Sequence, residues 1–263
     1  MRNRVTQRID RFDAHMHLND PAFAVGLGRR IDELAECGYA GAVSGWDFPS
    51  SERALELASA HSNFCATVGF HPCFLPENLP GALAALSGLA KCGAAAIGEC
   101  GLDETSSASP EFQREALEAQ LDLACSLGLP AVLHVRGKHG AMLEVLRSRK
   151  SNPKLLLHGA SLSRELLCAY LETGCMISLG GLILRRGAKR APDTAKAVPP
   201  DRLMIETDCP YQPPMPGMKN EPENLLAIAF AVAESRETDA ETVLKITEKN
   251  AHRFFGLTTE GME

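Results

Sequence analysis

Positive charge and aromatic side chains are both scarce in this sequence. Its 263 residues include 27 lysines and arginines against 33 aspartates and glutamates, and only 5% of them are aromatic. Proteins that hold duplex DNA by neutralising many phosphates are usually basic, and proteins that bind single strands stack bases on aromatic rings. The composition therefore argues against a broad nucleic-acid surface, and base-stacking positions are expected to be sparse. Bound metal ions could still supply the local positive charge needed to cut a nucleic-acid end.

Long apolar runs and paired cysteine motifs are also missing. No apolar run approaches the roughly 18 residues of a membrane span, and the charged first ten residues lack the apolar segment of a secretory signal. The nine cysteines are an odd number and form no CxxC pattern, which indicates free thiols in a reducing compartment. We therefore predict a cytoplasmic protein with no membrane attachment and no evident obligate protein partner.

Apolar, strand-like runs alternate with amphipathic helical stretches along nearly the whole chain. The eight runs lie near Arg11–Leu18, Ala40–Trp46, Phe64–Pro72, Ala94–Asp103, Pro130–Gly137, Lys154–Ala160, Cys175–Gly181 and Arg202–Pro210. A helix is expected over Glu111–Leu127, and glycines that end helices precede several strands, at positions Gly38, Gly93, Gly128 and Gly174.

Eight strand–helix units with no linker between them predict one (β/α)8 TIM-type barrel, a single domain over residues 1–263. The alternative is an open, doubly wound α/β sheet. Such a sheet normally carries a glycine-rich turn after its first strand, and Asp13–Asn19 has none.

Ionisable side chains stand at the ends of these strands, where apolar residues are the norm. Alternation along the first strand places Asp13, His15 and His17 on one face, directed into the barrel mouth. The later strands end with His71, Glu99, His134, His158 and Asp208. Active sites of such barrels are built at this end of the strands. A purely structural polar network is the alternative, but a carboxylate buried there without a cation or a hydrogen-bonding partner would be costly.

Histidines and carboxylates together are typical ligands of divalent metals. We expect one or two metal ions, with ligands His15, His17, Glu99, His134, His158 and Asp208. Imidazoles favour zinc, manganese or iron, whereas carboxylates and water suit magnesium, so the identity stays open. Such ions polarise a phosphoryl or carbonyl oxygen and lower the pKa of bound water to about 7. Asp208 would orient that water or take its proton, so metal-assisted hydrolysis is the predicted reaction.

Basic and aromatic residues near the expected mouth are candidates for substrate contacts. Arg136 follows His134 by two residues, so alternation directs it to the same mouth, where it would bind a substrate phosphate. The alternative is a surface ion pair. Trp46, at the end of the second strand, is either a contact of this face or a core residue. A basic loop follows the seventh strand, either as a funnel for a polyanion or as a solvated face, and comprises Arg185, Arg186, Lys189 and Arg190.

Seven ordered motifs span most of the chain. They are FDAHMH (12–17), GFHP (69–72), GECGLD (98–103), HVR (134–136), ETDCP (206–210), NEPENL (220–225) and NAHRFFGL (250–257). In these motifs the chain resembles the TatD family of metal-dependent hydrolases, within the amidohydrolase superfamily. Cys73 stands where the family often has a further histidine.

The resemblance implies a TIM-type barrel with a one- or two-metal centre. By position, His15 and His17 would bind one metal, and His134 and His158 the second. Glu99 would bridge the two ions.

The resemblance also implies a catalytic arrangement and a substrate. Asp208 would complete the site and help to activate water, and His71 would lie beside the metals, facing the substrate. Family members are known as magnesium-dependent deoxyribonucleases, several of them 3′→5′ exonucleases on single strands. We therefore predict a 3′→5′ exodeoxyribonuclease acting on single-stranded DNA ends. The alternatives are a D-aminoacyl-tRNA deacylase or another ester or amide hydrolase, and a metal-binding scaffold without catalysis.

Three cysteines lie within two residues of predicted site residues. Cys73, Cys100 and Cys209 are either inert small hydrophobes or points at which oxidation or thiol reagents would inactivate the protein. Alternation turns Cys100 and Cys209 away from their neighbours, so neither is expected to be a ligand.

Overall fold

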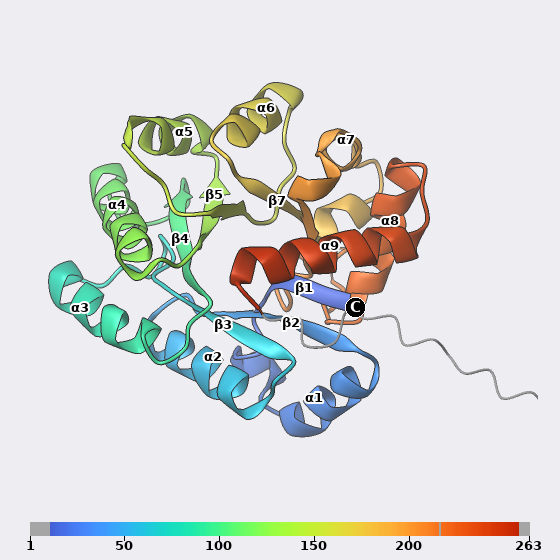
Figure 1. The fold of residues 1–263 in the computed structure, drawn as a ribbon, viewed down its shortest axis with the longest axis horizontal. Coiled ribbons are helices and arrows are strands. Elements are labelled where there is room, and N and C mark those ends of the chain that lie inside the picture. The colour runs from blue at the N-terminus through green and yellow to red at the C-terminus, as the bar shows by residue number, and fades with distance from the viewer. Residues whose placement is uncertain (1–10, 216, 258–263) are drawn as a thin grey trace, which may run out of the picture.

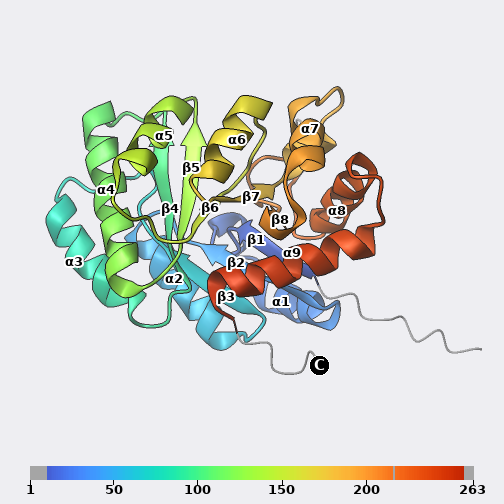
Figure 2. The same cartoon turned by 45° about the horizontal axis from the view of Figure 1, so that its top comes forward.

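The computed structural model describes residues 11–215 and 217–257 and consists of a ring of parallel strands surrounded by helices (Figures 1 and 2). The strands are β1 (Arg11–Met16), β2 (Tyr39–Ser44), β3 (Phe64–Val68), β4 (Ala96–Asp103), β5 (Ala131–Arg136), β6 (Leu155–Leu157), β7 (Met176–Leu179) and β8 (Leu203–Ile205). Each strand pairs with the next in chain order. The ring closes where His17 N donates to Cys209 O (2.8 Å) and Asp208 N donates to His15 O (2.9 Å).

The predicted (β/α)8 barrel is confirmed. That residues 1–263 form a single domain stays a prediction, since residues 1–10, 216 and 258–263 lie outside the described part of the chain. Among the described residues, no helix combines the length and apolar character needed to cross a membrane.

Helices alternate with the strands around the outside of the ring. They are α1 (Leu27–Glu36), α2 (Phe48–Ala60), α3 (Leu79–Ala90), α4 (Pro110–Leu127), α5 (His139–Ser148), α6 (Arg164–Glu172), α7 (Arg190–Ala197), α8 (Asn224–Ser235) and α9 (Ala240–Phe255). Short 3₁₀ helices span Pro21–Phe23, Gly181–Leu184 and Pro200–Arg202.

Local sequence explains where many helices begin and end. Side-chain oxygens accept a backbone N–H of the first helical turn at Asp47, Ser109, Ser163 and Asp239. The four glycines expected to end helices all have positive φ, namely Gly38, Gly93, Gly128 and Gly174. The helix predicted over Glu111–Leu127 is α4, which starts one residue earlier.

An apolar cluster fills the barrel beneath its mouth. Every strand contributes to it, through Phe12, Ala14, Ala42, Cys65, Ala96, Val132, Leu156, Met176 and Met204. Phe254 and Phe255 of α9, the helix that runs next to β1 in Figure 1, are part of the same cluster. Asn250 of α9 donates to the carbonyl of Leu203 (2.8 Å), the first residue of β8. The floor of the barrel therefore lies at the amino ends of the strands, and the carboxyl ends remain open.

A bulge in β1 changes which side chains face the mouth. The pairing of β1 with β2 shifts register between Asp13 and Met16, so residues 14 and 15 together oppose one residue of β2. Bulges of this kind redirect side chains. The prediction that Asp13 shares a face with His15 and His17 is wrong for this reason. Asp13 lies between two residues of the interior cluster and points to the opposite side of the strand.

A second bulge, in β4, directs Glu99 inward. The register with β5 shifts between Ile97 and Cys100, so Gly98 and Glu99 oppose Val132 alone. Gly98 has a φ of +147°, and a Cβ there would come within 2.7 Å of the carbonyl oxygen of Val132, so only glycine fits. Cys100 follows on the helix-facing side, fully buried, which confirms that it turns away from Glu99.

Asp13 is a buried acceptor that ties β1 to β2 and to the segment after β8. Its Oδ2 accepts from the Tyr39 and Thr207 hydroxyls (both 2.5 Å), and its Oδ1 accepts from Thr207 N (2.9 Å) and His15 N (3.2 Å). Burial nevertheless raises the pKa of its carboxyl to about 7, against the lowering effect of these hydrogen bonds.

We expect Asp13→Ala to lower the free energy of unfolding by about 3 kcal/mol or more, because it leaves several buried donors without an acceptor. Urea unfolding followed by circular dichroism measures this loss. Asp32→Ala, at an exposed position of α1, is the matched control and should change stability by less than about 0.5 kcal/mol. Equal stability of the two variants would show that Asp13 does not hold the ring together.

Candidate metal centre

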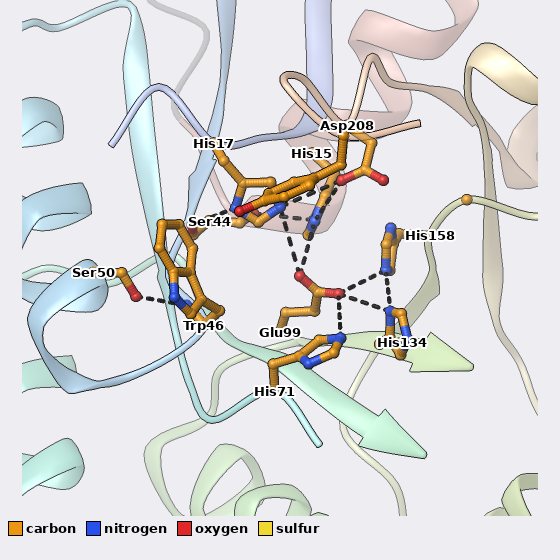
Figure 3. A network of polar contacts seen from close by, with 12 residues as sticks. His15, His17, Ser44, Trp46, Ser50, His71, Glu99, His134, His158 and Asp208 are labelled. Atoms are coloured by element: carbon orange, nitrogen blue, oxygen red, sulfur yellow. Dashed lines mark hydrogen bonds and ion pairs between the residues drawn. The ribbon is translucent and has the colours of Figure 1, made fainter. Parts of the chain in front are cut away.

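The carboxylate of Glu99 lies at the centre of the open end, between two groups of histidines (Figure 3). In the first group, Nε2 of His15 lies 3.3 Å and Nε2 of His17 lies 3.7 Å from Glu99 Oε2. The same two nitrogens lie 3.7 and 3.3 Å from Asp208 Oδ1. The structure therefore brings three of the six predicted ligands, His15, His17 and Asp208, together on one side of a fourth, Glu99.

The second group faces the other oxygen of Glu99. Nδ1 of His134 lies 2.9 Å and Nε2 of His158 lies 3.0 Å from Glu99 Oε1. Nε2 of His71 lies 3.5 Å from the same oxygen. One carboxylate thus spans both groups, which is the geometry expected of a residue that bridges two cations.

Each of the four predicted histidine ligands is held by a partner on its outward ring nitrogen. The contacts are His15 Nδ1 to Ser44 Oγ (3.0 Å), His17 Nδ1 to Ser44 O (2.9 Å), His134 Nε2 to Asp103 Oδ2 (2.9 Å) and His158 Nδ1 to Glu206 Oε1 (3.3 Å). Three of these partners can only accept a hydrogen bond, so in the neutral ring the outward nitrogen carries the proton and the inward nitrogen presents a lone pair. Metal-binding histidines are oriented in the same way by carboxylates and carbonyls.

Two of these orienting residues, Asp103 and Glu206, were missed by the sequence analysis. Asp103 is the last residue of β4, and Glu206 follows the last residue of β8. Both are buried, and Glu206 Oε1 also accepts from Gly159 N (2.6 Å). The signal was present, since both residues lie in the quoted motifs at strand ends. What their sequence positions could not reveal is which histidine each of them holds.

The buried carboxylates and imidazoles shift one another's pKa values strongly. Burial alone would raise the pKa of Glu99, but the neighbouring histidines, His158 foremost, hold it well below its usual range. Burial would lower the pKa of His158, yet Glu99 and Glu206 raise it well above its usual value. The pKa of His15 is lowered, chiefly by burial. The centre is therefore a concentration of negative charge that requires compensating cations or protons.

The residues present fit divalent metal ions. Nε2 of His15 is buried and has no hydrogen-bond partner among the described residues, although it points at two carboxylates. An orphaned imidazole nitrogen of this kind is what a metal would satisfy. Groups of ligand atoms close enough to share an ion include His15, His17 and Glu99, and His15, His158 and Asp208.

Asp208 is fixed at the edge of the first group. Its backbone adopts the left-handed region, with φ of 56°, which Asp tolerates better than most residues. Gln212 Nε2 donates to Asp208 Oδ2 (2.7 Å), while Oδ1 faces His15 and His17. One oxygen is thereby directed at the histidines and the other at the cavity side, where Gln212 lies.

His71 differs from the other histidines of the centre. Its Nδ1 accepts from Cys73 N (3.0 Å), so the neutral ring carries its proton on Nε2, the nitrogen that faces Glu99. Burial lowers the pKa of His71 to about 4, which keeps the ring neutral near pH 7. His71 is therefore suited to donate a hydrogen bond to a substrate oxygen.

A cavity of about 670 Å³ opens onto the centre. Its walls include Arg136 at the end of β5 and Arg185 in the loop after β7, and Cys209 and Cys100 are not among them. Within residues 11–215 and 217–257, neither guanidinium forms an ion pair, so the alternative of a surface ion pair for Arg136 is not observed. The other basic residues of the predicted loop do not line the cavity, namely Arg186, Lys189 and Arg190, and the last of these begins α7.

Cys73 is the one cysteine on the cavity wall among the described residues. We expect a bulky maleimide, applied at mildly alkaline pH because burial and Asp103 raise the pKa of this thiol, to remove most of the activity. Cys73→Ser should resist, since the other exposed cysteines lie outside the cavity. Assay of both proteins before and after alkylation measures the effect, and equal inactivation would assign it to another thiol.

Comparisons with known proteins identify the family of this chain. The sequence matches the family model described as TatD related DNase over residues 12–256. The uncharacterized metal-dependent hydrolase YabD of Bacillus subtilis is 32% identical over 250 residues, covering 93% of this chain and 98% of the relative. The 3′-5′ ssDNA/RNA exonuclease TatD of Erwinia tasmaniensis is 36% identical, covering 94% and 100%. The crystal structure of YJJV, a TatD homolog from Escherichia coli, superposes with a TM-score of 0.87 at 27% identity, covering 96% and 100%. The resemblance read from the motifs is thereby confirmed, and the chain belongs to the TatD family of metal-dependent hydrolases.

Proposed function

We propose that this protein removes nucleotides from the 3′ end of single-stranded DNA by metal-dependent hydrolysis of phosphodiester bonds. The ligands would be the six predicted residues, His15, His17, Glu99, His134, His158 and Asp208. The ions would be Mg²⁺, Zn²⁺ or Mn²⁺, one in each group of histidines. The free cysteines agree with a cytoplasmic location.

The observation that carries the proposal is the common orientation of the histidine rings in the centre. The outward nitrogens of His17, His134 and His158 donate to fixed acceptors, so in the neutral rings the inward nitrogens present lone pairs toward Glu99 and Asp208. Such groups repel one another unless cations or protons lie between them. Such an arrangement is suited to hold two cations, one on each side of the Glu99 carboxylate.

The residues around the ligands suit the hydrolysis of a phosphodiester. Divalent cations, when bound, polarise a phosphoryl oxygen and make water a stronger nucleophile. Asp208, steadied by Gln212, would accept the proton of the attacking water. The Nε2 proton of His71 would bond a non-bridging oxygen, and Arg136 would balance the charge that develops on the phosphate.

The substrate assignment draws support from the relatives. Those named 3′-5′ ssDNA/RNA exonuclease TatD match nearly the full length of this chain, at 36% and 35% identity in two Erwinia species. The cavity, open on one side and lined by two unpaired guanidinium groups, suits the end of a flexible polyanion better than a duplex.

The test is turnover of a 5′-labelled single-stranded oligonucleotide by metal-stripped protein supplied with Mg²⁺, Mn²⁺ or Zn²⁺ in turn. A ladder that shortens from the 3′ end, and that a Glu99→Gln preparation does not produce, would support the proposal and identify the metal. No cleavage with any metal would overturn it, and release of the amino acid from D-aminoacyl-tRNA would then be assayed.

We expect Arg136→Ala to raise the apparent KM for the oligonucleotide roughly tenfold, because a charged hydrogen bond to phosphate is lost. The change in kcat should be smaller. Arg147→Ala is the control, since Arg147 lies in the last turn of α5 and pairs with Glu172 away from the cavity. An unchanged KM in the Arg136 variant would remove the phosphate-binding role.

A further inference from the structure

Aromatic side chains are rare in this chain, yet three of them gather at the cavity. The chain has a single Trp and three Tyr, and the cavity is lined by Trp46, Phe74 and Tyr211. Phe74 is 54% exposed and Tyr211 is 47% exposed, in a protein whose other large apolar side chains are mostly buried. The expectation that stacking positions would be sparse holds for the whole chain but not for this mouth.

The three rings form two candidate stacking sites on opposite sides of Glu99. We call them the first station, Trp46 and Tyr211, and the second station, Phe74. Trp46 and Tyr211 both contact the ring of His17, with centroids 5.4 and 5.2 Å away. Phe74 contacts the ring of His71, with centroids 5.9 Å apart. His17 faces Oε2 of Glu99 and His71 faces Oε1, and Figure 3 shows the two histidines on either side of that carboxylate.

The residues that carry the rings are fixed by hydrogen bonds, while part of the surface of each ring is left open. The Tyr211 hydroxyl donates to Asp20 Oδ2 (2.7 Å), which fixes the ring at the mouth. For the other two residues it is the backbone that is fixed: the backbone N–H of Trp46 donates to Ser50 Oγ (2.8 Å), and that of Phe74 donates to His71 O (2.8 Å). The Tyr211 ring, held at its hydroxyl, loses little conformational freedom when a planar ligand stacks on it, and fixed backbones limit the same loss for Trp46 and Phe74.

The charges of the same cavity select among planar ligands. Arg136 and Arg185 line it, and within the described residues neither has an acidic partner. Unpaired guanidinium groups beside exposed rings suit a ligand that alternates phosphates with flat bases. A single-stranded nucleic acid has this alternation with a spacing that is free to adjust.

We propose that the two bases flanking the scissile phosphate stack on these stations, one on Trp46 and Tyr211 and the other on Phe74. The proposal rests on the proposed phosphodiesterase function and names the residues that recognise the substrate. Base stacking tolerates any sequence, because every base has a flat face. The protein would therefore require unpaired bases on both sides of the cut but would show little sequence preference.

The first test measures the kinetic contribution of each station. Phe74→Ala and Tyr211→Ala should each raise the KM for oligothymidylate roughly tenfold to a hundredfold. Tyr211→Phe keeps the ring and should lose less. Phe230→Ala is the matched control, since Phe230 is 60% exposed on α8 and does not line the cavity. On an oligomer of the same length without bases, Phe74→Ala and wild-type protein should have the same KM.

The second test does not depend on cleavage. Trp46 is the only tryptophan of the chain, so its emission reports what binds at the first station. Titration of the Glu99→Gln protein with oligothymidylate should quench this emission, and the same oligomer without bases should not.

The outcomes separate the two proposals. Cleavage with no quenching and an unchanged KM in both alanine variants would overturn the stacking proposal and leave the nuclease intact. Equal losses on the base-free oligomer would also overturn it, because the rings would then contact the backbone. Quenching by a protein that cleaves no oligonucleotide would preserve the stacking surface and overturn the nuclease.

Discussion

Glu99→Gln should abolish hydrolysis almost completely, with a loss on the order of a thousandfold or more in kcat. Both oxygens of Glu99 face histidines, Oε2 toward His15 and His17 and Oε1 toward His134 and His158. The substitution keeps the shape of the side chain but removes its charge and turns one acceptor into a donor. Several kcal/mol of lost transition-state stabilisation corresponds to a rate effect of this size.

The measurement compares single-turnover rates on the labelled oligonucleotide at saturating metal. Glu115→Gln, at an exposed position of α4, makes the same chemical change away from the centre and should retain full activity. Circular dichroism of both variants checks that they fold. A Glu99→Gln protein that keeps activity within a few-fold of wild type would contradict a bridging carboxylate.

Removal of bound metal should abolish activity and also lower the melting temperature by about 5–10 °C. A ligand that binds only the folded state at a hundred times its dissociation constant stabilises it by about 2.7 kcal/mol. In a domain of this size each kcal/mol shifts the melting temperature by about 2–4 °C. The physical reason here is that the ions would relieve the repulsion between the inward lone pairs and the buried carboxylates of Glu99 and Asp208.

Differential scanning fluorimetry of chelator-treated protein, with increasing Mn²⁺, Zn²⁺ or Mg²⁺, measures this shift. Restored activity and the rise in melting temperature should follow the same concentration dependence. The Glu99→Gln protein serves as the control and should respond less. A melting temperature unaffected by every metal, together with activity in excess chelator, would contradict a metal centre.

Much of the architecture could be predicted because it is encoded locally. Apolar runs mark all eight strands. Most strands are shorter in the structure than the predicted runs and stop before the polar residues at the carboxyl end: β3 stops at Val68 and β8 at Ile205. Glycines such as Gly128 end helices at the expected positions because a left-handed residue is needed there. The order of the strands around the barrel follows from strand–helix alternation with short connections.

The candidate site was predictable for a related reason. An ionisable residue at the end of an apolar strand is costly unless it has a partner, so His134, His158 and Asp208 are conspicuous in the sequence. The barrel brings all strand ends to one rim, so such residues must lie near one another. Their roles as metal ligands stay predictions that the experiments above address.

Two features could not be predicted from the sequence because they depend on contacts between strands. Alternation with a period of two predicts that Asp13 and His15 share one face of the strand. The bulge in β1 places them on opposite faces instead, and this bulge exists only in the pairing of β1 with β2. Asp103 and Glu206 escaped as well, because each contacts a histidine on a different strand, 31 and 48 residues away in the chain.

The sequence by itself determined the eight-stranded barrel, the family and the six candidate ligands, since each depends on short-range patterns or on residue type at a strand end. Only the tertiary structure decided which side chains face the centre and which partner holds each imidazole. It also decided that Trp46, Phe74 and Tyr211, far apart in the chain, meet at one cavity. The physical reason is that the direction of a side chain, the tautomer of an imidazole and the distance between two residues depend on contacts between distant segments. No local pattern of apolar and polar residues encodes these contacts.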